Sequence, residues 1–155
     1  GKTRPRRRTA PSAGATYPLD LYVLVTEVRG LTPGLYRYDQ QAHTLKRLQR
    51  GKLRPALQKA VGQSTVGRAP LAILIVATPK RTSVKYGKRA ITYVNIEAGA
   101  VGQNIALAAT ALGLGTVYIG AFFDAAMAKL LSLKAGQRVV GCLPIGRSQS
   151  RNASK

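Results

Sequence analysis

The sequence predicts a single layered domain of the α/β or α+β class. Short aliphatic segments alternate with helical segments along the chain, an order typical of helices packed on a β-sheet. Residues 71–77 are almost continuously aliphatic, as expected for a strand covered on both faces. Residues 89–112 carry apolar side chains at alternating steps of three and four, which predicts a long amphipathic helix ended by Gly113.

The other elements are justified by shorter patterns. A β-branched run at 20–26, followed by turn residues, predicts a strand. Further strands are expected at 35–38, 44–49, 116–121 and 139–145, and further helices at 53–61 and 125–131. The first two of these strands form a predicted hairpin whose loop holds His43, the only histidine, most simply a surface residue.

A second stripe of the long helix is made of small residues: Asn95, Gly99, Gly102, Ala106 and Ala109. Small side chains let two helices approach closely. We therefore expect this stripe to meet another helix, either within the chain or across a homodimer interface.

Composition restricts the function. The 25 Lys and Arg residues against 5 Asp and Glu give a net charge of +20, which predicts non-specific polyanion binding at low salt. The few carboxylates are scattered, which excludes paired-carboxylate and two-metal chemistry. Cys142 is the only cysteine, so neither an intrachain disulfide nor a cysteine zinc site is predicted, and no metal is expected. No apolar run reaches the roughly 20 residues of a membrane helix, so a cytoplasmic protein is the default expectation.

We expect a basic tail at 1–8, one domain at 9–147 and a flexible tail at 148–155. Just before the first strand, Arg7 and Arg8 precede Pro11, Ser12 and Gly14. Arginine donors suit phosphate, and a glycine lets a flat ring approach the backbone. Taken alone, this segment fits a basic coil leading into a strand better than a flavin site. The Gly113-Leu114-Gly115 stretch follows a helix, the reverse of the dinucleotide fingerprint, so no Rossmann site is predicted.

From Arg7 to Arg147 the chain resembles the FMN-dependent nitroreductase family, and within it the SagB-type dehydrogenases that form thiazoles and oxazoles. The likeness is carried by segments 7–18, 34–38, 85–87, 93–104, 112–122 and 144–147. It implies an α+β fold with a mixed central sheet flanked by helices, the long helix lying at about 89–112. It also implies FMN as cofactor and makes NAD(P)H a candidate reductant.

The resemblance assigns roles to individual residues. The implied FMN-binding residues are Arg7, Arg8, Pro11, Ser12, Ala13, Gly14, Gly120, Ala121 and Arg147. The pair Lys85 and Tyr86 matches the proton-transfer or substrate-side pair of the azoline-oxidising branch. The resemblance therefore predicts a homodimeric oxidoreductase acting on a small molecule or a modified peptide.

Two departures keep alternatives open. Family members generally carry an N-terminal helical section with an arginine-rich segment that grips the FMN phosphate, and nothing upstream of Lys2 supplies it here. The stretch Glu97-Ala98-Gly99-Ala100 also has alanine where the branch often has histidine. The alternatives are a basic polyanion-binding or nucleic-acid-binding protein on the same scaffold, and a flavin-free, non-catalytic remnant.

Overall fold

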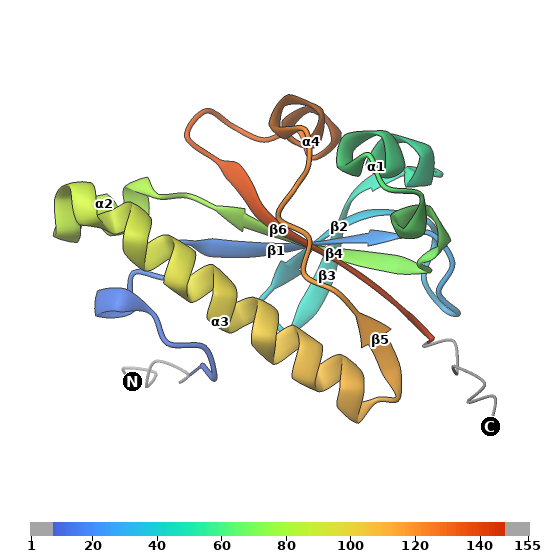
Figure 1. The fold of residues 1–155 in the computed structure, drawn as a ribbon, viewed down its shortest axis with the longest axis horizontal. Coiled ribbons are helices and arrows are strands. Elements are labelled where there is room, and N and C mark those ends of the chain that lie inside the picture. The colour runs from blue at the N-terminus through green and yellow to red at the C-terminus, as the bar shows by residue number, and fades with distance from the viewer. Residues whose placement is uncertain (1–7, 148–155) are drawn as a thin grey trace, which may run out of the picture.

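The fold is a six-stranded sheet with helices on both faces (Figure 1). The structure, a computed structural model, describes residues 8–147, so Arg7 and the segments 1–7 and 148–155 lie outside the described residues. The strands are β1 Leu19–Val25, β2 Gly34–Asp39, β3 Thr44–Arg50, β4 Leu71–Ala77, β5 Leu114–Thr116 and β6 Arg138–Arg147. The helices are α1 Arg54–Val61, α2 Lys80–Tyr86, α3 Ala90–Ala111 and α4 Asp124–Leu130, with short 3₁₀ turns η1 Ala13–Ala15, η2 Ser64–Arg68 and η3 Gly87–Arg89.

The strand order is β3-β2-β1-β4-β6-β5. The predicted α+β class, the long helix and the hairpin are confirmed. The expectation of a mixed sheet is wrong, because every described strand pair is antiparallel. β1 runs opposite to both β2 and β4, and β6 runs opposite to both β4 and β5, so each step across the sheet reverses direction.

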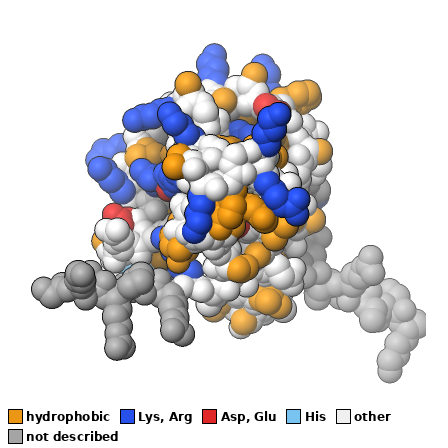
Figure 2. All heavy atoms as spheres, turned by 90° about the vertical axis from the view of Figure 1, so that its left-hand side faces the viewer, with side chains coloured by type: hydrophobic (Ala, Val, Ile, Leu, Met, Phe, Trp, Pro, Cys, Tyr) orange, Lys and Arg blue, Asp and Glu red, His pale blue; other side chains and the backbone are white. Residues whose placement is uncertain are grey.

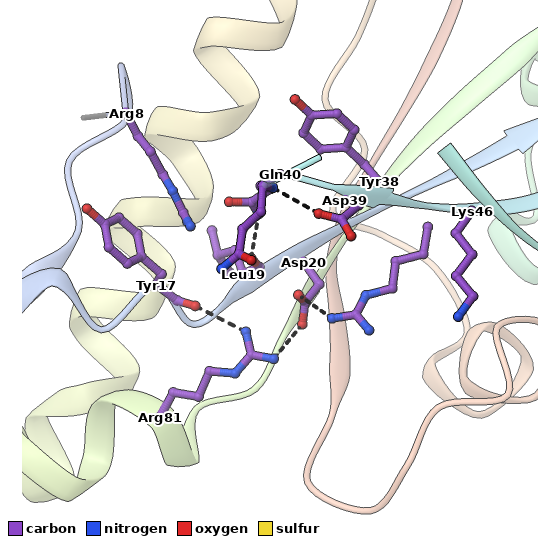
Figure 3. A pocket seen from close by; sticks show the side chains of 11 residues that line it. Arg8, Tyr17, Leu19, Asp20, Tyr38, Asp39, Gln40, Lys46 and Arg81 are labelled. Carbon is purple, nitrogen blue, oxygen red and sulfur yellow. Dashed lines mark hydrogen bonds and ion pairs between the residues drawn. The ribbon is translucent and has the colours of Figure 1, made fainter. Parts of the chain in front are cut away.

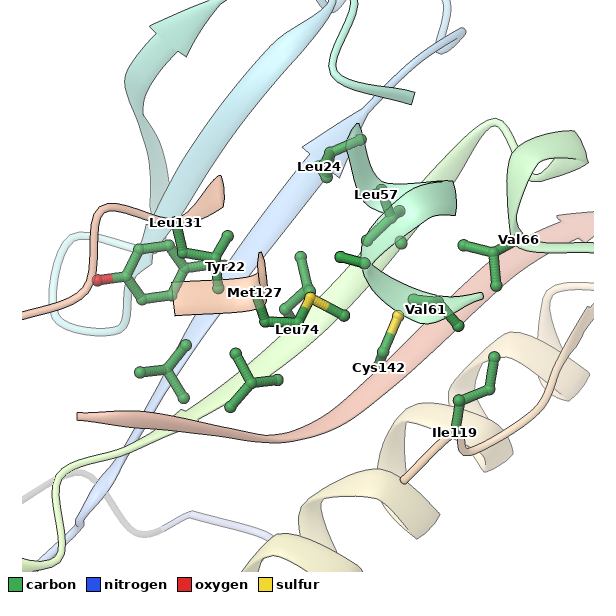
Figure 4. Close-up of a cluster of buried hydrophobic side chains, with 14 of the residues drawn as sticks. Tyr22, Leu24, Leu57, Val61, Val66, Leu74, Ile119, Met127, Leu131 and Cys142 are labelled. Carbon is green, nitrogen blue, oxygen red and sulfur yellow. The ribbon is translucent and has the colours of Figure 1, made fainter. Parts of the chain in front are cut away.

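The two faces of the sheet carry separate hydrophobic clusters. On one face α1 and α4 cover a cluster that includes Leu57, Leu74 and Met127 (Figures 1 and 4). On the other face α3 contributes Val94 and Ala98 to a cluster with strand residues. Neighbouring residues of β4 therefore pack on opposite faces, which confirms the prediction for segment 71–77. Burial of these side chains is the main stabilising contribution to the domain.

The apolar stripe of α3 is buried at its centre and exposed at its ends. Val94 and Ala98 are buried, whereas Ile91 and Leu112 are exposed, because the helix extends beyond the sheet it covers. The small-residue stripe is also partly used within the chain. The ring of Tyr118 lies against Gly102 where a Cβ would stand, so this position packs on an intrachain tyrosine and not on a second helix. The Tyr118 hydroxyl donates to the Val140 carbonyl at 2.8 Å.

The strand expected at 116–121 is shorter and ends early, at Thr116. The register that pairs Thr116 with Ile145 and Ile119 with Cys142 places Val117 opposite Pro144. Proline has no N–H to donate, so the ladder is interrupted there and resumes only as the Ile119–Cys142 bridge.

Helix α2 was not predicted. Its sequence has no apolar periodicity, and Thr82 is its one buried residue. The helix is held by contacts to α3 and η1, which a local pattern does not reveal.

Candidate functional site

The segment before β1 lies along α3 and reaches α2. Asn104 of α3 donates from Nδ2 to the Thr9 hydroxyl at 3.2 Å. Further along the segment, the Thr16 and Thr82 hydroxyls are 2.8 Å apart. The predicted cofactor-binding segment therefore runs from the C-terminal half of α3 to the helix that carries Lys85 and Tyr86.

Gly14 brings the two predicted halves of the site together. It has a φ of 58°, in the left-handed region that favours glycine. A Cβ placed on Gly14 would stand 2.6 Å from Tyr86 Oη and 2.7 Å from Lys85 Nζ. The tips of both side chains thus lie against the bare backbone of Gly14, although they are more than 70 positions away in the sequence.

Lys85 and Tyr86 are open to solvent in the single chain. Lys85 is exposed, and Tyr86 is half-buried. The Tyr86 ring meets the Tyr93 ring edge to face, with centroids 4.9 Å apart, which orients the phenol toward η1. The described part of the chain leaves both side chains accessible to a ligand or to a partner chain.

Glu97 is a functional candidate that the sequence reasoning missed. It lies on α3 beneath the cofactor segment and is only 6% exposed. Burial raises the pKa of its carboxyl group, while a hydrogen bond from Ser12 and the charge of Arg8 act in the opposite direction. The Ser12 oxygen also accepts the Tyr17 N–H at 2.9 Å. A lone carboxylate between the apolar residues Val94 and Ala98 was the available signal.

Gly120 and Ala121 follow the Ile119–Cys142 bridge and are both exposed. Ile119 and Phe123 donate their N–H groups to backbone carbonyls, whereas no described backbone carbonyl accepts the N–H of Gly120 or Ala121. These two N–H groups can therefore serve as donors to a ligand.

Arg147, the last predicted phosphate ligand, lies at a different place. It ends β6 and pairs with Leu114 of β5, which follows the C-terminal end of α3. Gly14 lies against α2, which precedes α3. Because α3 has 22 residues, its ends are about 33 Å apart. The structure therefore brings Gly14, Lys85 and Tyr86 together but does not bring them to Arg147 within one chain.

Pro11 is exposed and Ala13 half-buried, at the start of η1. Arg8 lies with its guanidinium 3.7 Å from the centroid of the Tyr17 ring. Cys142 is fully buried, and burial raises its pKa to about 12, so its thiol is not a nucleophile.

The surface is strongly basic on the face that carries α2 and the N-terminal segment. Figure 2 shows Lys and Arg side chains spread over this face with few acidic ones between them. Within residues 8–147 no group of three His, Cys, Asp or Glu side chains is arranged to hold a metal ion. In the same part of the chain, no helix combines the length and the apolar character needed to cross a bilayer.

Comparisons with known proteins agree with this architecture. Residues 6–147 match the Nitroreductase family. A nitroreductase-like protein of Methanocaldococcus jannaschii is 40% identical over 141 residues, which cover 90% of this chain and 70% of that protein. A crystal structure of a nitroreductase-like protein from Anabaena variabilis has a TM-score of 0.86 and 30% identity, over 90% of this chain and 29% of that one.

A third similar structure shares the fold alone. It is the Escherichia coli microcin synthetase McbBCD complex with truncated pro-MccB17 bound, with a TM-score of 0.79 and 20% identity, covering 92% of this chain and 56% of that one. The matches define a class of oxidoreductases that are typically flavin-dependent. The chain belongs to the nitroreductase family.

Proposed function

We propose that the protein is an FMN-dependent oxidoreductase that transfers hydride through the flavin to or from a small organic or azoline-type substrate. The observation that carries the proposal is the convergence of Lys85 and Tyr86 on Gly14, a backbone position with no side chain. A flat ring placed beside Gly14 would touch both functional groups. It would also supply the cover that Lys85 and Tyr86 lack in the single chain.

The chemistry of the surrounding groups fits FMN. Bound FMN would supply reversible two-electron chemistry. Arg8 and Arg147 offer fixed cations for its phosphate, and the N–H groups of Gly120 and Ala121 offer donors for charge on the reduced ring. Arg7, Pro11, Ser12 and Ala13 complete the proposed set, with Ser12 held by Tyr17 and Glu97.

Lys85 and Tyr86 are proposed to hold and move the proton that accompanies hydride transfer. The edge-to-face contact with Tyr93 fixes the phenol, and the lysine amine lies beside it at Gly14. A modified peptide is proposed as the substrate because the pair Lys85 and Tyr86 matches that of the azoline-oxidising branch. NAD(P)H is proposed as the reductant when the flavin works in the opposite direction.

Flavin binding is tested by titrating the purified protein with FMN and riboflavin. FMN should co-elute with the protein and raise its melting temperature. Arg147→Ala should weaken FMN binding about 10- to 100-fold, the loss expected for a charge-assisted contact, and riboflavin binding less than about threefold. Arg50→Ala, at the opposite edge of the sheet, is the matched control and should leave both affinities unchanged.

An equal melting temperature with and without saturating FMN would contradict the flavin site. The flavin-free, non-catalytic alternative would then be favoured. An equal loss of affinity for FMN and riboflavin in Arg147→Ala would show that Arg147 does not bind the phosphate.

The +20 charge favours polyanion binding as the second candidate function. Nucleic-acid binding with a clear sequence preference in near-physiological salt would promote it over the flavoenzyme.

We also propose that the protein is a homodimer whose flavin sites are shared between subunits. Gly14 and Arg147 lie toward opposite ends of α3, so a second subunit is needed to bring Arg147 of one chain to Gly14 of the other. The exposed face of α3 supports this: Ile96 is 61% exposed and Leu107 is 59% exposed, and their spacing places both on one face.

Sedimentation at tens of micromolar protein and moderate salt should show a dimer. Ile96→Asp should weaken it by about thirtyfold or more, because a charge would be desolvated in a central apolar contact. Leu48→Asp on the edge strand β3 also replaces an exposed leucine by a charge and should leave the dimer intact. A wild-type monomer, or equal effects of the two variants, would contradict this interface.

A further inference from the structure

A basic pocket of about 360 Å³ lies beside the proposed flavin segment, between the hairpin and α2 (Figure 3). Its charged lining is Arg8, Arg37, Lys46 and Arg81, together with Asp20 and Asp39. Four cations thus face two carboxylates. The volume lies at the lower end of the range for small-molecule sites.

Asp20 fixes two of the arginines. It is 8% exposed, and its two oxygens accept hydrogen bonds from different residues. Arg37 Nη2 donates to Oδ1 at 2.9 Å, and Arg81 Nη2 donates to Oδ2 at 2.8 Å. A guanidinium has five N–H donors, so both arginines keep donors for a ligand while their positions are held. Figure 3 shows the guanidinium group of Arg81 next to the Asp20 carboxylate.

Lys46 adds a positive charge to the lining of the pocket. It stands directly opposite Arg37 in the β2–β3 register, and like charges in such a pair destabilise a sheet. No described carboxylate forms an ion pair with Lys46. The Asp39 carboxylate is turned into its own loop, where it accepts the N–H groups of Gln41 and Ala42 at 2.9 and 3.0 Å. Arg37 and Lys46 thus place two positive charges next to each other in the lining of the pocket.

We propose that this pocket binds the phosphate group of a small molecule other than the flavin. A phosphate monoester carries about −1.5 to −2 charge at neutral pH, opposite in sign to the net positive charge of the lining. The arginine donors held by Asp20 suit the geometry of phosphate oxygens. The ligand is either a phosphorylated substrate or a phosphate-bearing nicotinamide reductant.

Tyr17 joins this pocket to the proposed flavin segment. Its N–H donates to Ser12, and its carbonyl accepts from Arg81 Nη1 at 3.1 Å. Its ring lies under Arg8, another residue of the pocket lining. A phosphate in the pocket would therefore hold the rest of its molecule next to Ser12 and Gly14, where a reductant or substrate has to lie.

The test measures inorganic phosphate binding to the flavin-free full chain by calorimetry at constant ionic strength. Lys46→Gln should weaken binding about three- to tenfold, as expected for losing one partly exposed charge contact. Lys59→Gln on α1 removes the same charge outside the pocket and should leave the affinity unchanged. Equal effects of the two variants, or phosphate binding by neither the wild type nor the variants, would overturn the site.

Ligand pairs then identify the source of the phosphate. A loss with Lys46→Gln for NADPH but not for NADH assigns the pocket to the reductant. Weaker inorganic phosphate binding with both dinucleotides unaffected assigns it to a phosphorylated substrate. A loss for FMN but not for riboflavin would overturn the proposal, because the pocket would then be the flavin's own phosphate site. Since phosphate binding is measured without flavin, this proposal and the proposed function fail separately.

Discussion

Replacing Lys85 by glutamine is expected to slow the flavin-dependent oxidation of an azoline-containing peptide by about 10²- to 10⁴-fold, the range for loss of a general acid or base. The amine lies at Gly14 beside the Tyr86 hydroxyl, where it can take the proton released as hydride leaves the substrate. Tyr86→Phe, which keeps the ring against Tyr93 and removes the hydroxyl, should lose activity in the same range. Rates are measured at saturating FMN.

Lys88→Gln is the matched control, because Lys88 is an exposed lysine three positions away. It should retain the wild-type rate. FMN affinity should be unchanged in Lys85→Gln. The rate of NAD(P)H-driven reduction of a nitroaromatic compound should fall much less than the rate of azoline oxidation, because nitroaromatic reduction does not need Lys85 to take a proton from the substrate. Equal losses in both reactions, or a similar loss in Lys88→Gln, would contradict the proton-transfer role.

Gly14→Ala should lower turnover about a hundredfold while the protein stays folded. The new methyl group would stand where Tyr86 Oη and Lys85 Nζ now lie, and both are the free ends of side chains that can move aside. Displacing reacting groups by about 1 Å is enough for a loss of this size. The left-handed φ of 58° adds a stability cost of about 1–2 kcal/mol. Turnover and thermal unfolding are measured on the same preparation.

Gly30→Ala is the control that separates the effect of backbone strain from the effect of a methyl group next to Lys85 and Tyr86. Gly30 has a φ of 84°, and a Cβ there would meet nothing within 4 Å. It should lose the same 1–2 kcal/mol of stability and keep its turnover. If both variants kept the wild-type turnover, the contact of Lys85 and Tyr86 with Gly14 would not matter for catalysis.

Strong periodicity made much of the fold predictable. Helix α3 lies within one residue of the predicted span at each end, and β4 has the two buried faces that its aliphatic run indicated. The errors arose where tertiary contacts decide. Pro144 interrupts the strand that Val117 would continue, and Tyr118 occupies the small-residue surface at Gly102. The local sequence after Thr116 does not reveal Pro144 as its neighbour, and the local sequence of α3 does not reveal Tyr118 as its neighbour.

The candidate site was predictable only in part, and by resemblance. The motif around Gly14 and the pair Lys85–Tyr86 were both picked out, but their meeting depends on α2, which has no periodic pattern. Glu97 was missed because it stands within an apolar stripe that periodicity assigns to packing. The pocket around Asp20 was missed because its charged residues come from three strands, a helix and the segment before β1.

Helix α3 has a genetic consequence. Gly14 lies near one end of this helix and Arg147 near the other, so in the proposed homodimer a lesion in either residue would damage only half of each shared site. Two different inactive alleles, one altered at Gly14 and one at Arg147, would form mixed dimers in which one site receives both defects and the other receives none. Co-expressed, they would complement each other and recover up to a quarter of wild-type activity, on the basis of random pairing and one intact site in each mixed dimer.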